Sequence, residues 1–166
     1  MAPTNKRNLL MRLVRRRGDL PVLLEAVIWL LVARIILRLL TITRAVSLLI
    51  PTRRLSLTLP VSLDTLARVR WAVRLAARKV PWRALCFEQG IAAQRMLMRR
   101  GIAANLVYGV ARHRNGSIEA HVWTRVADHT VVGGSLGDRF NPIVAFVPGV
   151  GVVECEIADE PKTPLQ

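Results

Sequence analysis

Two cysteines are present, and one of them stands where a reactive thiol is expected. Cys86 opens a helical pattern that runs to Arg100, and Gly101 follows it, as glycine does at many helix C-termini. A thiol in the first turn lies at the positive end of the helix dipole, which favours the thiolate. Because a thiolate with a nearby base is a good nucleophile at neutral pH, Cys86 is a candidate nucleophile.

The candidate base is His121, which lies in a segment of alternating polarity. Residues 106–110 and 118–126 flank Asn115-Gly116, the strongest short signal for a two-residue hairpin. That turn predicts three opposed pairs across the hairpin. They are Val110 with His121, Tyr108 with Trp123 and Arg112 with Glu119. We expect the cysteine helix to lie on the sheet face that carries His121.

Each of these residues also has an ordinary structural interpretation. A lone cysteine is most often a small buried apolar residue, and a lone histidine in a strand is most often structural. Cys155 serves as an internal comparison, because the neighbouring Glu154 and Glu156 would raise a thiol pKa. We interpret Cys155 as structural.

Four short runs strengthen the interpretation of Cys86 and His121. They are Pro81–Gln89, Ala93–Ile102, Gly109-Val110 and Ala120–Trp123. Together they resemble the transglutaminase-like peptidase of lasso-peptide biosynthesis, the leader-removing B protein, over roughly residues 63–146. In that family a Cys-His-Asp set hydrolyses the precursor peptide and releases its leader. The resemblance implies that Cys86 is the nucleophile and His121 the base.

The third catalytic residue is harder to assign, because Asp128 and Asp138 both follow His121. With a turn at Asp128-His129, Asp128 lies seven residues along the strand, roughly 23 Å from His121. Asp138 lies diagonally opposite the histidine, at roughly 7–8 Å between backbones. We predict Asp138 as the acid, with Glu119 as the fallback. Gly133-Gly134 would end this ladder early and occupies positions where family members can carry the acid.

The resemblance also implies partners. They are a precursor peptide, a macrolactam synthetase that closes the ring, and a leader-recognition protein. We expect the recognition protein to be a separate chain, because the N-terminal part contains an apolar helix and no strand-rich module. No cofactor is implied. With three histidines and no Cys-x-x-Cys motif, the sequence offers no metal-ligand spacing.

Charge is distributed unevenly along the chain. Residues 1–100 carry twenty Lys or Arg against four acids, and residues 101–166 carry five against seven. With 52% hydrophobic and 5% aromatic residues and no recognised motif, nucleic-acid binding is not expected. A docking face for an acidic partner or anionic lipid is favoured. Two cysteines make no disulfide framework, which favours the cytoplasm.

The N-terminal part raises the question of a membrane. We expect a helix from an Asp19 N-cap, with Pro21 in its first turn, to about Leu49. Residues 20–40 are nearly all apolar, but Glu25, Arg34 and Arg38 interrupt them. Each central charge costs about 2.5–3.5 kcal/mol on insertion into a membrane, and the apolar residues return a similar total, so the insertion free energy lies near zero. A core or interfacial helix, with Arg34, Arg38 and Thr41 on one polar stripe, is favoured over a membrane anchor.

These patterns predict an α+β fold with a papain- or transglutaminase-like core. We expect a helical region at 1–60, packed on a cysteine peptidase core at 61–158, and a tail at 159–166. Ser62 is predicted as the N-cap of a helix that Pro81 ends. The favoured function is leader removal through a Cys thioester. The alternatives are a transglutaminase-like acyltransferase and a non-catalytic, basic, membrane-associated scaffold.

Overall fold

Three helices and a five-stranded antiparallel sheet form the part of the chain that the structure describes. This computed structural model describes residues 6–41, 44–45, 48, 62–112, 116–134 and 139–155. The helices are α1 (Lys6–Leu39), α3 (Leu63–Lys79) and α4 (Cys86–Arg99). The strands are β1 (Asn105–Arg112), β2 (Ile118–Val126), β3 (His129–Val132), β4 (Asn141–Val147) and β5 (Gly151–Glu154). The predicted α+β class is confirmed.

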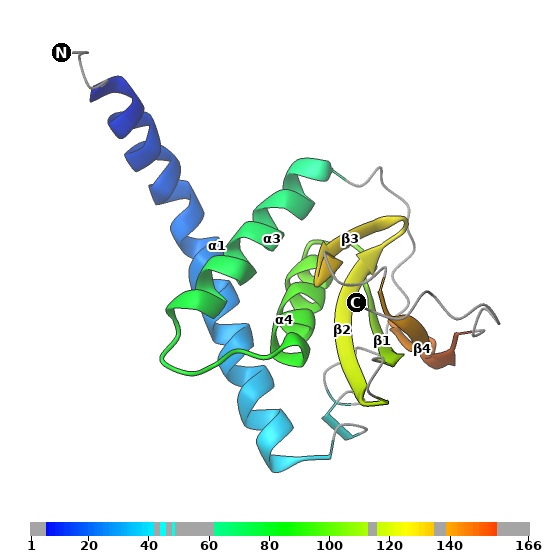
Figure 1. Cartoon of the computed structure of the whole chain (residues 1–166). Helices are drawn as coiled ribbons and strands as arrows, with labels where there is room; N and C mark the ends of the chain where they lie inside the picture. Colours follow the sequence, from blue (N-terminus) through cyan, green and yellow to red (C-terminus); the bar gives the residue numbers. More distant parts are fainter. Residues whose placement is uncertain are drawn as a thin grey trace.

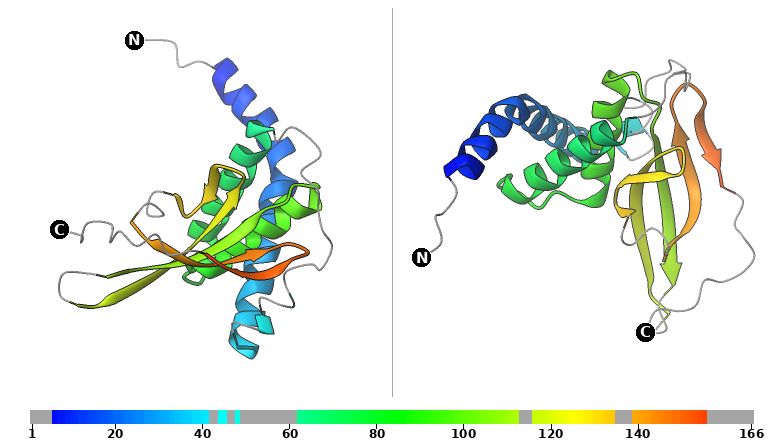
Figure 2. Two further views of the ribbon diagram at one scale, coloured as in Figure 1. Left: turned by 90° about the vertical axis from the view of Figure 1, so that its right-hand side faces the viewer. Right: turned by 90° about the horizontal axis from the view of Figure 1, so that it is seen from above.

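The elements form layers in which α4 is central. Figure 1 shows α1 and α3 on one side of α4 and the sheet on the other. The view from above in Figure 2 separates the helices from the sheet clearly. The buried residues of α4 contact apolar side chains of both neighbouring layers, as Met96 and Ile91 illustrate. The cysteine helix is therefore fixed from both sides.

The first helix differs from the expectation at both ends. It begins at Lys6, well before Asp19, and it ends at Leu39 with Pro21 inside it. Asp19 is not an N-cap, because it lies inside α1. Its carboxylate pairs with Arg68 of α3 at 2.8 Å, so the residue that resembled a local cap makes a tertiary contact.

Burial of α1 is one-sided. Ala26, Leu30 and Ala33 are fully buried against the other helices and the sheet. The opposite side exposes large apolar residues at successive helical turns, namely Leu20, Leu24, Ile28, Leu31, Ile35 and Leu39. Exposure of α1 is therefore not confined to the polar stripe. We call these six residues the α1 stripe.

One segment of α1 meets the length and hydropathy requirements of a membrane span. It is Gly18–Leu39, with a mean hydropathy of 2.3. Core helices of soluble proteins and N-terminal signal sequences meet the same requirements, so this property alone indicates no location.

The second helix follows its sequence signals closely. Ser62 is the N-cap, and its hydroxyl accepts from the Thr65 N–H at 3.5 Å. The buried positions of α3 are Leu66, Val69, Ala72, Val73 and Ala76. The arginines of α3 lie outside this stripe, on the exposed side.

The hairpin of β1 and β2 is shifted by one residue from the predicted register. His121 pairs with Gly109, Tyr108 with Val122, and Arg112 with Ile118. A Cβ on Gly109 would lie 2.6 Å from Trp123 Cη2 and 2.5 Å from the Asn141 carbonyl oxygen. Only glycine at this position leaves room for the indole of Trp123, so side-chain packing favours the observed register. The register predicted from the Asn-Gly turn was wrong by one residue.

The last two strands extend the sheet beyond β1. β4 pairs with β1 on one side and β5 on the other, so it lies inside the sheet. The strand order is β3-β2-β1-β4-β5. β3 is short and lies beside β2, and among the described residues it pairs with β2 only from Thr124 to Val126.

Candidate active site

The start of α4 is anchored by its own third residue. Cys86 is the first residue of the helix, and the Glu88 carboxylate accepts the Leu85 N–H at 3.2 Å. The other oxygen of Glu88 pairs with Arg34 of α1 at 3.3 Å. Because Glu88 is buried, this pair connects the cysteine end of α4 to the neighbouring helix and fixes its position.

The approach of α4 to the sheet is close at Gly90. A Cβ there would lie 2.5 Å from Leu106 Cδ1 and 3.0 Å from Val122 Cγ1. The Thr124 hydroxyl donates to the Gly90 carbonyl at 3.0 Å, which joins β2 directly to the helix. A glycine at this position therefore allows the helix to carry Cys86 up to β2.

Cys86 and His121 meet at the edge of the sheet. The face that contacts α4 carries Val122 and Thr124, so His121 belongs by alternation to the opposite face, with Trp123. The expectation that α4 lies on the face of His121 was wrong. The contact forms because β3 ends at Val132 and leaves this part of β2 uncovered.

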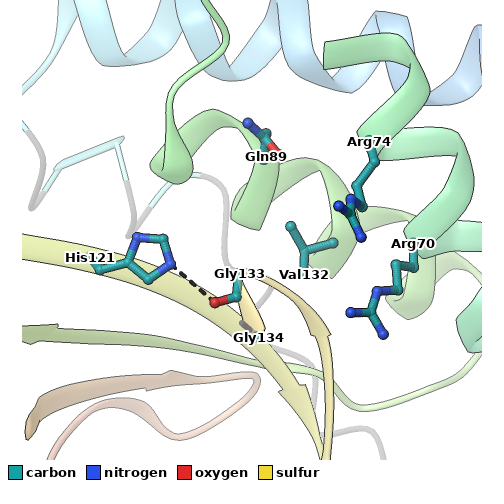
Figure 3. Close-up of a pocket in the computed structure, with 7 residues that line it drawn as sticks. All are labelled: Arg70, Arg74, Gln89, His121, Val132, Gly133 and Gly134. Atoms are coloured by element: carbon teal, nitrogen blue, oxygen red, sulfur yellow. Dashed lines mark hydrogen bonds between the residues drawn. The ribbon is translucent and has the colours of Figure 1, made fainter. Parts of the chain in front are cut away.

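The imidazole of His121 is held by backbone and by aromatic rings. Its Nε2 lies 3.1 Å from the Gly133 carbonyl oxygen, as Figure 3 shows. Because a carbonyl only accepts, this contact favours the tautomer with Nε2 protonated and leaves Nδ1 to take a proton from Cys86. The centroid of the imidazole also lies 5.1 Å from that of the Phe140 ring and 6.2 Å from that of the Trp123 ring.

The two side chains alter each other's protonation. Burial raises the pKa of the Cys86 thiol. The pKa is nevertheless lowered below its usual value by a hydrogen bond from His121, by the Val122 and Phe87 N–H groups and by the imidazolium charge. The hydrogen bond with Cys86 raises the pKa of His121; burial opposes this, and the Gly133 carbonyl adds to it. Both shifts favour a thiolate and imidazolium pair.

Gly133 requires a backbone conformation that only glycine adopts without strain. Its φ is +85°, and a Cβ would lie 2.7 Å from both Trp123 Cβ and the Val122 carbonyl oxygen. A side-chain acid at this position would displace the backbone of β2. The carbonyl of Gly133 takes the place beside His121 Nε2 that a triad acid occupies elsewhere.

Two of the three sequence candidates for the acid, Asp128 and Glu119, lie among the described residues. Asp138 lies outside the described residues. The turn before β3 is at Ala127-Asp128, and the fully exposed Asp128 lies 4.0 Å from Arg125. Glu119 is exposed on β2, and its charge adds to the raised pKa of His121.

The second cysteine is far from this arrangement. Cys155 follows β5, at the sheet edge opposite to β3, and its N–H donates to the Ile143 carbonyl at 2.8 Å. It is half-buried and makes no disulfide.

A cleft of about 220 Å³ opens beside His121. It is lined by Arg70 and Arg74 of α3, Gln89 of α4, His121, and Val132–Gly134 at the end of β3 (Figure 3). Sequence reasoning missed Arg70, Arg74 and Gln89, because arginine recurs along α3 and nothing local marks two of them. The Gly-Gly dipeptide was the available signal for an unusual backbone at Gly133.

A family comparison agrees with this geometry. The sequence model of the transglutaminase-like superfamily matches residues 27–145, which is well over half of the chain. The chain belongs to the transglutaminase-like superfamily. The match begins within α1 and includes Cys86 and His121. No curated protein and no solved structure matches the chain. Membership of this superfamily supports chemistry of the cysteine peptidase or acyltransferase type.

Proposed function

We propose that this protein is a cysteine peptidase that removes the leader from a lasso-peptide precursor. The observation that carries the proposal is the proximity of Cys86 and His121 at the N-terminus of α4, where each side chain shifts the other's pKa, lowering that of the thiol and raising that of the imidazole. The choice of a lasso-peptide precursor as substrate rests on the sequence segments around both residues, which resemble those of the lasso-peptide leader peptidases.

In this mechanism His121 acts alternately as base and as acid. Nδ1 first takes the thiol proton to give the thiolate and imidazolium pair; Cys86 Sγ then attacks the scissile carbonyl carbon, and the oxyanion forms near the Cys86 N–H at the positive end of α4. The C–N bond then breaks, His121 returns the proton to the leaving amine, and a thioester remains. Water, deprotonated by His121, hydrolyses the thioester and regenerates the thiol.

We further propose that the Gly133 carbonyl orients His121 during these steps. It accepts the Nε2 proton and so keeps Nδ1 directed at the sulfur. A neutral carbonyl stabilises the imidazolium less than a carboxylate does, so an additional acid would stabilise it further. Asp138 remains the sequence-based proposal for that acid.

The direct experiment combines the purified protein with a precursor peptide encoded beside its gene, and mass spectrometry of the products. We expect two peptides whose masses sum to that of the precursor plus one water. Cys86→Ala should abolish cleavage while Cys155→Ser retains it. Joining of the acyl product to an added amine would instead identify an acyltransferase. Undiminished cleavage by a folded Cys86→Ala protein would refute the mechanism.

The proposed partners follow from the same resemblance. We propose that a separate leader-recognition protein delivers the precursor, and that a macrolactam synthetase then uses the released N-terminus. The α1 stripe is the surface that we assign to the recognition protein, since it presents six apolar side chains along one side of a helix connected to the site through Arg34. We propose a cytoplasmic protein, with peripheral membrane contact as the competing use of this stripe.

A further inference from the structure

The cleft beside His121 has one strongly basic wall. Arg70 and Arg74 are four residues apart on α3, so they lie on the same side of the helix. Figure 3 shows both side chains extending from α3 toward the end of β3. None of the residues that line the cleft is acidic. The cleft therefore holds two neighbouring guanidinium groups with no countercharge in its lining.

Two other arginines of the helical part are neutralised. Arg68, two residues before Arg70 on α3, pairs with Asp19 at 2.8 Å, and Arg100, directly after α4, pairs with Glu25 at 2.7 Å. Neither Arg70 nor Arg74 has an ion-pair partner among the residues that the structure describes. Within the described part of the chain, the charges of the two arginines that line the cleft are thus not neutralised by an ion pair.

The position of the cleft indicates which part of a substrate enters it. His121 lines the cleft and Cys86 does not. In acyl transfer the acyl group stays on the sulfur, whereas the leaving amine departs beside the imidazole that protonates it. Substrate residues that follow the scissile bond therefore lie on the His121 side, next to Arg70 and Arg74.

We propose that Arg70 and Arg74 form a subsite for an aspartate or glutamate side chain within the first few residues after the scissile bond. This inference rests on the proposed function. A guanidinium binds a planar carboxylate through two parallel hydrogen bonds, and two guanidinium groups one turn apart provide both charge and direction. The cleft is a narrow site beside the imidazole, which fits one side chain better than an extended anionic surface.

Binding to the full-length Cys86→Ala protein tests the subsite without cleavage. The probes are fluorescent precursor peptides with Glu or Gln placed in turn at each of four positions on either side of the cleavage site. We expect Glu to bind about tenfold more tightly than Gln at one position after the bond, as a charge-assisted pair requires. The double variant Arg70→Gln/Arg74→Gln should lose this preference and retain the affinity for the Gln peptide.

Arg78→Gln is the matched control, because Arg78 is exposed one turn beyond Arg74 and does not line the cleft. It should keep the Glu preference within about twofold. In an active enzyme the double variant should raise KM for the Glu peptide and leave kcat nearly unchanged.

Four results would overturn the subsite. They are the absence of a Glu preference, a preference only before the scissile bond, an equal loss in Arg78→Gln, and binding of anionic vesicles through the two arginines without any peptide preference. If wild type cleaves no peptide but the Glu preference and its loss are observed, the proposed function fails and the subsite stands.

Discussion

Arg34 of α1 and Glu88 of α4 lie fifty-four residues apart in the sequence and form an ion pair at 3.3 Å. Glu88 is 6% exposed, and its second oxygen accepts the Leu85 N–H directly before the candidate nucleophile. The Arg34 guanidinium also lies 5.6 Å from the centroid of the Trp82 ring. This pair joins the N-terminal helix to the start of α4 and so contributes to the position of Cys86.

Replacing Glu88 with Gln should destabilise the protein, because Arg34 would lose its anionic partner; the amide oxygen of Gln can still accept the Leu85 N–H. We expect a loss of about 1–3 kcal/mol in the free energy of unfolding, measured with urea. Arg125→Gln breaks the exposed pair with Asp128 and should change stability by less than about 0.5 kcal/mol. Equal effects of the two substitutions would contradict the anchoring role of Glu88.

The rate at which iodoacetamide alkylates Cys86 should rise with pH at a lower midpoint than that of an ordinary cysteine. The reason is that His121 and two N–H groups outweigh burial in setting the pKa of the thiol. In His121→Ala the midpoint should move to higher pH, because burial then acts against fewer stabilising groups. Cys155 in the same sample provides the reference. An unchanged midpoint in His121→Ala would show that the imidazole does not set the pKa of Cys86.

The lowered pKa of Cys86 and the raised pKa of His121 also predict the shape of the cleavage profile. Activity should increase as the thiolate forms and decrease when His121 loses its proton above its usual pKa. Replacing Gln89, which lines the cleft and donates to the Ala84 carbonyl at 2.9 Å, should leave both limbs in place. The measurement is kcat/KM against pH, and a profile without an alkaline decrease would argue against a required imidazolium.

Gly133→Ala should impair both stability and the orientation of His121. The new Cβ would meet backbone atoms of β2 at 2.7 and 2.9 Å, and φ of +85° is strained for alanine. Gly116→Ala is the control, since Gly116 has a similar φ of +81° with nothing within 4 Å of the Cβ. We expect about 1 kcal/mol of strain in the control and at least about 2 kcal/mol more in Gly133→Ala from urea unfolding. Similar losses in both variants would mean that contact with β2 is unimportant.

The role of Asp138 is decided by comparing Asp138→Asn with Asp128→Asn. If the Gly133 carbonyl orients His121 by itself, both variants should cleave the precursor within about threefold of wild type. A large loss only in Asp138→Asn would establish Asp138 as a third catalytic residue, as the sequence favoured. Circular dichroism of both variants provides the check on folding.

Docking of the recognition protein on the α1 stripe predicts a selective defect. Leu24→Lys/Leu31→Lys places two charges on the exposed side of α1 and should reduce the stimulation of cleavage by the recognition protein at least about tenfold. Alkylation of Cys86 should be unchanged, which shows that the site is intact. Val152→Lys, on exposed β5, is the control. Unchanged stimulation together with lost binding to uncharged lipid vesicles would assign the stripe to a membrane.

Local signals determined the helices around the site. The Ser62 cap, the break at Pro81 and the glycine after α4 gave correct boundaries for α3 and α4, because capping and chain termination depend on residues close in sequence. The same reasoning failed at Asp19, whose carboxylate pairs with Arg68 and caps nothing. A capping residue and an ion-pair partner have identical local patterns, so sequence could not separate them.

Only the tertiary structure decided how the site is assembled. The alternating pattern of β2 indicates that its residues face two sides, but it does not indicate which side α4 covers. That depends on two glycines: Gly90 allows α4 to approach β2 closely, and Gly109 leaves space for the Trp123 ring. The contact of His121 with the Gly133 carbonyl arises because β3 stops at Val132. Register, strand length and close approach depend on contacts distant in sequence, and a periodic pattern does not contain them.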